Sequence, residues 1–394
     1  MAGLTDEQWK IFDKVEDVLS HVDELVMLAG GAVRDHLLDI APEDLDFATT
    51  SVPEKTARAF RSKGYHVIPT GIKHGTITVV IDKVPVEITT LRIDEKTDGR
   101  HAEVSWTKDF KQDAARRDLT INAMFMSPVG VIHDFFGGRE DLQHRMIRFV
   151  GNDEARIRED YLRILRYFRF LSRYDGAQAD PSTMHVIARW AHGLKQISGE
   201  RIWSELSKIF VGPNRLIAAE FMHNNYVFDN ISQHLVYDSN ARHKMRMLNG
   251  NSRARSPLYF IASMIRSGQG LNLIRERLKF DNNSFDILNT IVGLPSVGST
   301  LTVDSVRESV AKGARADLLY HRAVYDWNTP VCEFLDDFRK NPMPKFPVSG
   351  TDIKALGYEG RQIGEALDLL KEAWAQSKYK ATKEALIELM RGEG

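Results

Sequence analysis

The stretch Leu25–Leu38 reads LVMLAGGAVRDHLL, in which Gly30 and Gly31 join an apolar run to a pattern typical of a helix. Glycine adopts backbone angles that are closed to other residues, so a glycine turn lets backbone N–H groups approach a ligand closely. At a helix start these groups and the helix dipole favour an anion, and Arg34 adds a charged donor. The stretch predicts a phosphate-binding turn, with a purely structural turn as the alternative.

Two carboxylates follow this turn, in Asp44–Phe47 (DLDF). Residues two apart project from the same face of a strand, so Asp44 and Asp46 can share one cation. Nucleotidyl transfer needs such a pair, because a 3′-hydroxyl must lose its proton while the growing charge of a triphosphate is neutralised. Mg²⁺ held by carboxylate oxygens does both. The alternative is two aspartates that solvate a turn after Pro42, and the preceding glycine turn argues against it.

Glu87 is the candidate for a third metal ligand. It lies in Val86–Thr90 (VEITT), where it alternates with apolar neighbours as residues of a half-buried strand do. The same pattern is typical of an ordinary carboxylate on the outer face of a sheet. Both interpretations stay open at this point.

Composition and charge narrow the class of protein. The 394 residues exceed the usual span of one hydrophobic core, which predicts two or more folding units. Hydrophobic residues at 43% and charged residues at 27% are ordinary for a soluble globular protein. The formal net charge of -1 gives no overall basic field, so a polyanion would have to bind a local cluster of arginines and lysines.

The single cysteine, Cys332, excludes an internal disulfide and a thiolate metal cluster. It fits a reducing compartment, and we expect a cytoplasmic protein. No apolar run is long enough to cross a bilayer, so we expect no membrane partner.

Strand and helix patterns are distributed unevenly along the chain. Up to about residue 150, short β-rich runs such as Thr76–Ile81 and Val84–Thr89 alternate with helical patterns. From Glu154 onward, apolar residues recur at spacings of three and four, as on one face of a helix. The polar and basic stretches Asp238–Pro257 and Gly293–Thr302 predict internal joints. The sequence therefore predicts an α+β part followed by a helical part.

Three motifs occur in a fixed order, namely Gly30–Asp35 (GGAVRD), Asp44–Thr49 (DLDFAT) and Arg116–Ala123 (RRDLTINA). In this order and spacing they resemble the superfamily of CCA-adding enzymes and poly(A) polymerases. Two later motifs, Glu159–Arg163 (EDYLR) and Ile197–Ile202 (ISGERI), resemble the nucleotide-selecting and helix-supporting motifs of its class II members. The resemblance covers nearly all of the chain.

The resemblance implies a fold with a nucleotidyltransferase head, an α+β domain with a small mixed sheet and helices, at residues 1–148. It implies an all-α neck that selects the nucleotide at residues 149–225, and an all-α body and tail that bind tRNA at residues 226–394. The shape of such enzymes is elongated and seahorse-like.

The resemblance also implies a reaction in which C, C and A are appended to the 3′ end of tRNA. CTP and ATP are the substrates, Mg²⁺ is the metal, and no DNA partner is expected. Asp44 and Asp46 are then the catalytic metal ligands, and Asp118 contacts the ribose hydroxyls. Arg166 continues the predicted helix of Arg163, where it either holds the triphosphate or is a solvated arginine that packs only its stem. The nucleotide-binding positions of the family match Gly30, Gly31, Arg34, Arg116, Arg117, Asp118, Asn122, Asp160, Arg163 and Arg166.

A choice of C and A over U and G has a simple physical basis. C and A each carry an exocyclic amine beside a ring nitrogen acceptor, where U and G present a carbonyl oxygen. A carboxylate accepts from the amine and a guanidinium donates to the ring nitrogen. Asp160 and Arg163 lie three apart on the predicted helix and so share one face. The alternative is a surface ion pair worth a few tenths of a kcal/mol.

The polar stretch Asp94–Asp109 includes Asp98 and Arg100 and resembles the flexible loop with which complete CCA-adding enzymes switch from C to A. CC-only relatives lack it, so the resemblance implies complete addition, although composition alone indicates a plain surface loop. Two rival functions remain. A poly(A) polymerase of the same superfamily tends to be longer and more basic than this chain. A non-catalytic RNA-binding protein would have no reason to keep Asp44 and Asp46.

Overall fold

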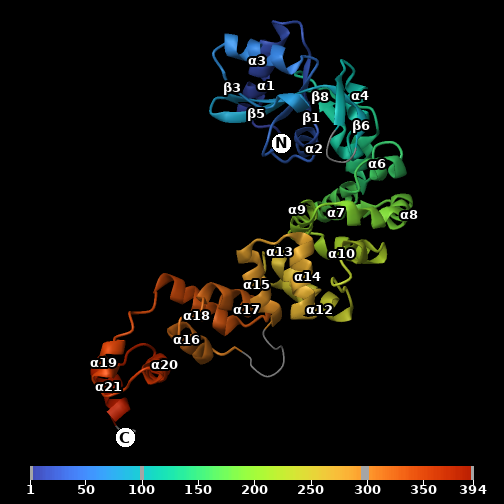
Figure 1. The fold of residues 1–394 in the computed structure, drawn as a ribbon. Coiled ribbons are helices and arrows are strands. Elements are labelled where there is room, and N and C mark those ends of the chain that lie inside the picture. Colours follow the sequence, from blue (N-terminus) through green and yellow to red (C-terminus); the bar gives the residue numbers. More distant parts are fainter. Residues whose placement is uncertain (1–2, 98–101, 294–300, 392–394) are drawn as a thin grey trace. The chain divides into compact units, whose positions relative to one another are not determined.

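The computed structural model describes residues 3–97, 102–293 and 301–391 (Figure 1). The chain divides into two compact units, Met1–Ile231 and Ser232–Gly394. All strands of the described residues belong to the first unit, together with helices α1 to α11, and helices α12 to α21 form the second. The expected succession of an α+β part and a helical part is confirmed. The finer division at residues 148 and 225 stays a prediction.

The head is built on one mixed sheet, which has seven strands among the described residues. In spatial order these are β3 (His66–Gly71), β4 (Thr76–Ile81), β5 (Val84–Thr90), β2 (Asp46–Thr49), β1 (Val26–Ala29), β8 (Met124–Met126) and β9 (Ile132–Asp134). Neighbours pair antiparallel except β2 and β5, which run parallel with Asp46 opposite Glu87. Two shorter ladders join β6 (Arg92–Thr97) to β7 (Ala102–Trp106) and β10 (Met146–Ile147) to β11 (Gln178–Ala179).

Alternation along the strands decides which side chains reach the core. In β4 the residues Ile77, Val79 and Ile81 are buried, and in β5 Val86 and Ile88 are buried while Glu87 between them is exposed. Because successive side chains of a strand point to opposite faces, Glu87 lies on the face away from this core. Asp46, its partner in the register, is exposed on β2 as well.

Helices complete the first unit. They are α1 (Asp6–Ser20), α2 (Gly31–Leu37), α3 (Pro53–Ser62), α4 (Phe110–Ala115), α5 (Gly138–Gln143), α6 (Asp153–Glu159), α7 (Leu162–Arg173), α8 (Pro181–Trp190), α9 (Gly199–Ile209), α10 (Arg215–Asn224) and α11 (Val227–Ile231), with the 3₁₀ turns η1 (Ile72–His74), η2 (Thr120–Asn122) and η3 (Ala191–Gln196). The apolar stripe Leu162, Leu165, Phe168 and Leu171 of α7 is buried, as its spacing predicts, and α7 packs against α9 and α10.

The second unit consists of helices in its described residues. They are α12 (Ser239–Gly250), α13 (Pro257–Ser263), α14 (Gly268–Leu278), α15 (Asn282–Gly293), α16 (Val303–Ala311), α17 (Ala316–Tyr325), α18 (Thr329–Lys340), α19 (Gly350–Lys354), α20 (Arg361–Gln376) and α21 (Lys383–Arg391). None of the helices in the described ranges combines the length and the apolar composition that a bilayer span requires.

The joint predicted at Asp238–Pro257 is wrong for most of its length, which forms α12. The side chain of Asp238 caps this helix by accepting a hydrogen bond from the N–H of Ala241 at 2.9 Å. Ala241, Met245 and Leu248 bury one face of it. A polar composition therefore concealed a helix with a cap and a narrow apolar stripe. Most of the other predicted joint, Gly293–Thr302, lies outside the described residues.

Candidate active site

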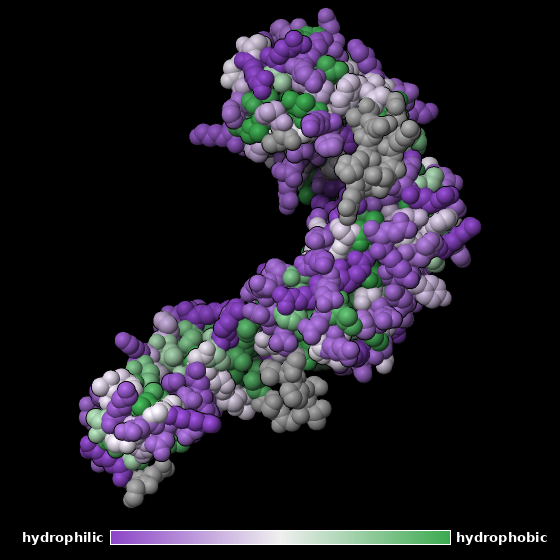
Figure 2. All heavy atoms as spheres, in the orientation of Figure 1, coloured by the Kyte–Doolittle hydropathy of each residue, from purple (hydrophilic) through white to green (hydrophobic). Residues whose placement is uncertain are grey.

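A cavity of about 550 Å³ lies in the first unit, and charged side chains dominate its lining. The hollow visible in Figure 2 beside the head is edged mostly by hydrophilic residues. The lining residues are Ala29, Gly30, Gly31, Arg34, Asp46, Phe47, Glu87, Thr89, Arg116, Arg117, Asp118, Asn122, Asp160, Leu162, Arg163, Arg166, Phe170 and Arg201. Motifs that lie far apart in the sequence thus meet around one space.

The glycine turn places two guanidinium groups at this cavity. Gly30 precedes α2 with φ 62° and ψ −118°, a backbone conformation that only glycine adopts readily. A Cβ at Gly30 would lie 2.6 Å from Nη1 of Arg117, and one at Gly31 would lie 3.5 Å from Nη2 of Arg34. A side chain at Gly30 would therefore collide with the guanidinium of Arg117, whereas one at Gly31 would make only an ordinary contact with that of Arg34.

Arg34 is buried and fixed on several sides. Its guanidinium donates to Oδ1 of Asn122 and, at 2.9 Å, to Oδ1 of Asp35. It also stacks over the ring of Phe170, with the guanidinium carbon 5.2 Å from the ring centroid. Arg34 thus holds the turn of the head against α7, with its orientation set before any ligand binds.

Replacing Gly30 by alanine tests the role of the turn. We expect a loss of roughly 1–3 kcal/mol of stability from backbone strain. Because the nearest obstacle to the new Cβ is the guanidinium end of the Arg117 side chain, this group will be displaced and the KM for nucleotide will rise. Thermal unfolding and initial rates at varied CTP concentration measure the two effects. The control is Gly130→Ala, at another positive φ but with no neighbouring atom within 4 Å of the new Cβ, which should lose stability alone. An unchanged nucleotide KM in Gly30→Ala would contradict the role.

Asp46 and Glu87 form the carboxylate pair of the cavity. They stand opposite each other on the parallel strands β2 and β5, and both line the space. Asp46 reaches solvent through the cavity mouth, but protein atoms surround much of it. This desolvation, with the negative charges of Glu87 and Asp44, raises the pKa of Asp46 to about 6 against the opposing charge of Arg117.

Asp44 lies at the edge of this group. It is exposed just before β2 and is not among the residues that line the cavity. Across the described ranges, no group of three or more histidine, cysteine, aspartate or glutamate side chains is arranged to hold a metal ion. Of the three carboxylates predicted as metal ligands, Asp46 and Glu87 line the cavity, and the place of Asp44 as a ligand stays a prediction.

Asp118 anchors Arg166 in the lining of the cavity. Arg166 donates from Nε to Oδ2 of Asp118 at 2.6 Å, while the N–H of Leu119 and the amide of Asn122 bind Oδ1 at 2.8 and 3.4 Å. Burial alone would raise the pKa of Asp118, but the charge of Arg166 and these hydrogen bonds hold the pKa below its usual value. The carboxylate is therefore ionised at neutral pH and fixes the guanidinium that faces the cavity.

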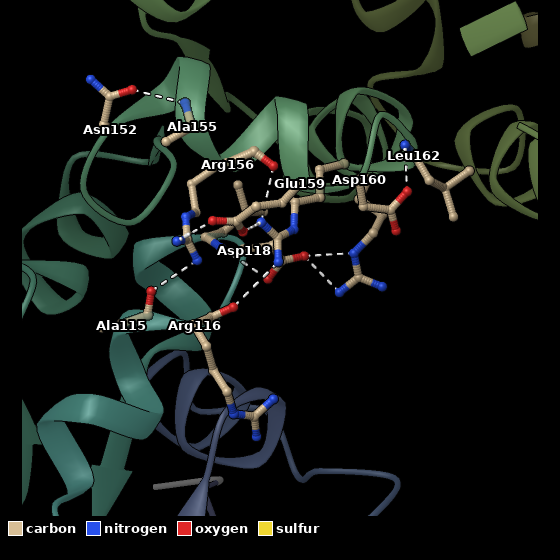
Figure 3. Close-up of polar contacts among 12 residues, drawn as sticks. Ala115, Arg116, Asp118, Asn152, Ala155, Arg156, Glu159, Asp160 and Leu162 are labelled. Atoms are coloured by element: carbon tan, nitrogen blue, oxygen red, sulfur yellow. Dashed lines mark hydrogen bonds and ion pairs between the residues drawn. The ribbon is translucent and has the colours of Figure 1, made fainter. Parts of the chain in front are cut away.

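The helix predicted to carry both Asp160 and Arg163 is interrupted at the junction of α6 and α7 (Figure 3). Asp160 and Arg163 do not share one helix, because α6 ends at Glu159 and Asp160 is extended with φ −154° and ψ 107°. Asp160 instead accepts a hydrogen bond from the N–H of Leu162, the first residue of α7, at 3.0 Å. Both residues still line the cavity, but each is held by another partner.

These partners are Arg201 and Glu159. Nη2 of Arg201 donates to Oδ2 of Asp160 at 2.6 Å, and Nη1 of Arg163 donates to Glu159. Arg163 also donates to the carbonyl of Arg116, past the end of α4, at 3.4 Å. Asp160 is thus tied to α9, and Arg163 to the head.

The chain matches two family models over parts of its length and individual proteins over nearly all of it. Residues 26–148 match the family described as "Poly A polymerase head domain", and residues 178–235 match "Probable RNA and SrmB- binding site of polymerase A". The "CCA tRNA nucleotidyltransferase 1, mitochondrial" of Danio rerio is 37% identical, over 91% of this chain and 85% of that protein. The chain belongs to the CCA-adding enzymes. The Homo sapiens protein of the same name is 38% identical, over 92% of this chain and 86% of that protein.

A solved structure agrees with this membership. The Bacillus stearothermophilus CCA-adding enzyme in complex with CTP superposes with a TM-score of 0.77 and 25% identity, covering 96% of this chain and 97% of that one. The resemblance to the CCA-adding family that the motifs carry is therefore confirmed, and this family consists of metal-dependent nucleotidyltransferases.

Nearly every residue that the sequence predicted for the site of a CCA-adding enzyme lines the cavity. Asp44 lies outside its lining, and Asp98 and Arg100 lie outside the described residues. The sequence interpretation gave no site role to Phe170 or Arg201, which do line it. Each had a signal. Phe170 stands four residues after Arg166 and so shares its helix face, and Arg201 lies inside the motif Ile197–Ile202.

Proposed function

We propose that this chain adds C, C and A to the 3′ end of tRNA without a nucleic acid template. CTP and ATP are the substrates, the 3′-hydroxyl attacks the α-phosphate, and pyrophosphate leaves. The observation that carries the proposal is the convergence of a carboxylate pair, an arginine cluster and the pair Asp160 and Arg163 around one cavity. The CCA-adding relatives favour this reaction over poly(A) synthesis.

The carboxylates fit a hard divalent cation, and we propose Mg²⁺. Mg²⁺ commonly takes one or two carboxylates from the protein and fills its other positions with water and substrate phosphates, so Asp46 and Glu87 would suffice to hold it. Asp44, whose negative charge already acts on Asp46, would add a third ligand. When bound, such a cation neutralises charge on the triphosphate and makes the 3′-hydroxyl a better nucleophile.

The arginines of the cavity suit the triphosphate. Arg34, Arg116, Arg117 and Arg166 all line it, and a guanidinium presents N–H donors in a fork that matches phosphate oxygens. Their orientations are set by carboxylates such as Asp35 and Asp118 behind them. Asp118 would also receive a ribose hydroxyl. Its oxygens already accept hydrogen bonds, so the ribose would share an oxygen with Arg166 or Asn122.

Asp160 and Arg163 carry the choice of base. Arg201 holds the carboxylate of Asp160 in place and leaves it able to accept from the amine of C or A. Arg163 uses Nη1 and one N–H of Nη2 for protein acceptors, and its other donors have no partner among the described residues. U and G would set a carbonyl oxygen against the carboxylate, which is repulsive.

The assay for the function uses a tRNA that lacks its last three residues, Mg²⁺ and each nucleotide in turn. We expect two residues from CTP alone, a third from ATP once both are present, and no further growth. A long tail made from ATP would instead indicate a poly(A) polymerase. The absence of any extension, with tRNA still bound, would indicate a binding protein.

For the compartment we propose the cytoplasm, because the single cysteine, Cys332, is buried and unpaired and needs no oxidising surroundings. The names of the two relatives place them in mitochondria. Fractionation of the source cells separates these locations, and recovery with an organelle fraction would contradict the proposal.

A further inference from the structure

Asp113 is a buried carboxylate directly behind the arginines of the cavity. It lies on α4, its side chain is 2% exposed, and it does not line the cavity itself. Oδ1 accepts from Nε of Arg116 at 2.8 Å, and Oδ2 accepts from Nη2 and Nε of Arg117 at 3.1 and 3.3 Å. Each oxygen of this one carboxylate therefore holds one arginine.

The spacing along the chain explains the arrangement. Arg116 and Arg117 follow Asp113 by three and four residues, so a single helical turn brings both onto its side. The backbone N–H of Arg92, at the start of β6, also donates to Oδ1 at 3.2 Å. Burial alone would raise the pKa of Asp113, but the charges of Arg117 and Arg116 and these hydrogen bonds lower it, so the group is ionised at neutral pH.

The two arginines depend on Asp113 to different degrees. Arg117 is also held by the carbonyl of Asn122 at 3.1 Å and by the ring of Phe125, 4.9 Å from its guanidinium carbon. For the side chain of Arg116, Asp113 is the one hydrogen-bond or ion-pair partner that the described residues supply. Without Asp113, Arg116 would lose its anchor and two like charges would stand side by side.

We propose that Asp113 is a positioning residue that sets the guanidinium groups of Arg116 and Arg117 for the triphosphate of the incoming nucleotide. The inference rests on the proposed function. A guanidinium fork binds phosphate well only when its plane is fixed, because an unanchored side chain must be ordered on binding. The triphosphate is common to CTP and ATP. A change at Asp113 should therefore affect both nucleotides equally and leave the choice of base intact.

The variant Asp113→Asn keeps the size of the side chain and removes its charge. We expect the KM for CTP and for ATP to rise by the same factor, on the order of tenfold or more. The KM for tRNA and the preference for C and A should not change, and kcat should fall less than the nucleotide KM rises. Asp113→Glu, which restores the charge one methylene further out, should recover part of the loss. Calorimetric titration of the free enzyme with ATP and Mg²⁺ should show the same weakening without tRNA.

The matched control is Asp141→Asn. Asp141 is a buried carboxylate of the same unit that pairs with Arg148 and accepts from Thr120, and it does not line the cavity. This variant should lose stability in thermal unfolding but keep its nucleotide KM. If Asp113→Asn behaved like Asp141→Asn, with a nucleotide KM and an ATP affinity within about twofold of the wild type, the proposal would be overturned.

Two further outcomes are decisive. If Asp113→Asn does not fold, Asp113→Ser, which also removes the charge, takes its place, and an unchanged nucleotide KM in that variant overturns the proposal. A wild-type protein that extends no tRNA refutes the proposed function. A wild type that extends tRNA, combined with an unaffected Asp113→Asn, refutes only the role of Asp113.

Discussion

Asp46→Asn should lower the rate of nucleotide addition by about a thousandfold or more, because metal ions supply several kcal/mol of charge stabilisation and each 1.36 kcal/mol is a factor of ten. The substitution removes one of the two carboxylates, Asp46 and Glu87, that are opposite each other on β2 and β5 and line the cavity. It should not disturb the fold, since Asp46 is exposed and its register partner Glu87 repels it. We expect unchanged or slightly raised thermal stability together with near-complete loss of activity.

The measurement is a single-turnover rate of C addition at several Mg²⁺ concentrations. Glu87→Gln and Asp44→Asn extend the series. A variant that has lost a metal ligand should need more Mg²⁺ for half-maximal activity and should also have a lower maximal rate. Asp82→Asn is the control, since this carboxylate lies in the turn between β4 and β5 and pairs with Lys14 on the surface. Wild-type activity in Asp46→Asn would remove the basis of the catalytic account.

Asp160→Asn should lower the discrimination between CTP and UTP by about 10- to 100-fold, the worth of a bidentate contact to a base edge. The side-chain oxygen of asparagine can still accept from the N–H of Leu162 at the start of α7. The helix should therefore persist while the negative charge that repels the carbonyl of U is lost. Arg163→Ala should weaken selection as well, because the donor to the ring nitrogen disappears.

The quantity to measure is kcat/KM for each of the four nucleotides on the same tRNA. Arg189→Ala is the control for Arg163→Ala, since Arg189 is a 72% exposed arginine on α8 that does not line the cavity. Its four values should match the wild type. A preference for C and A that survives in both Asp160→Asn and Arg163→Ala would mean that other groups read the base.

The sequence predicted the fold class well, because the patterns that mark strands and helices are local. The alternation in Thr76–Ile81 marks a strand, and the spacing of apolar residues in Leu162–Arg173 marks a helix. The Asp238–Pro257 prediction failed, because its polar composition outweighed the narrow apolar stripe of Ala241, Met245 and Leu248. The break between α6 and α7 was missed for a similar reason, as Glu159–Arg163 has no glycine or proline to mark it.

The sequence by itself determined which chemical groups the site would contain, since each motif carries its residue types and their spacing wherever the chain goes. Only the tertiary structure decided which carboxylate meets which cation, because ion pairs form between groups brought together by packing. Glu87 faces the cavity because β5 pairs in parallel with β2, and Asp160 is held by Arg201 because α9 packs on α7. Apolar residues that recur with a period of two in a strand or 3.6 in a helix indicate which face of the element is buried, but not which other element covers that face.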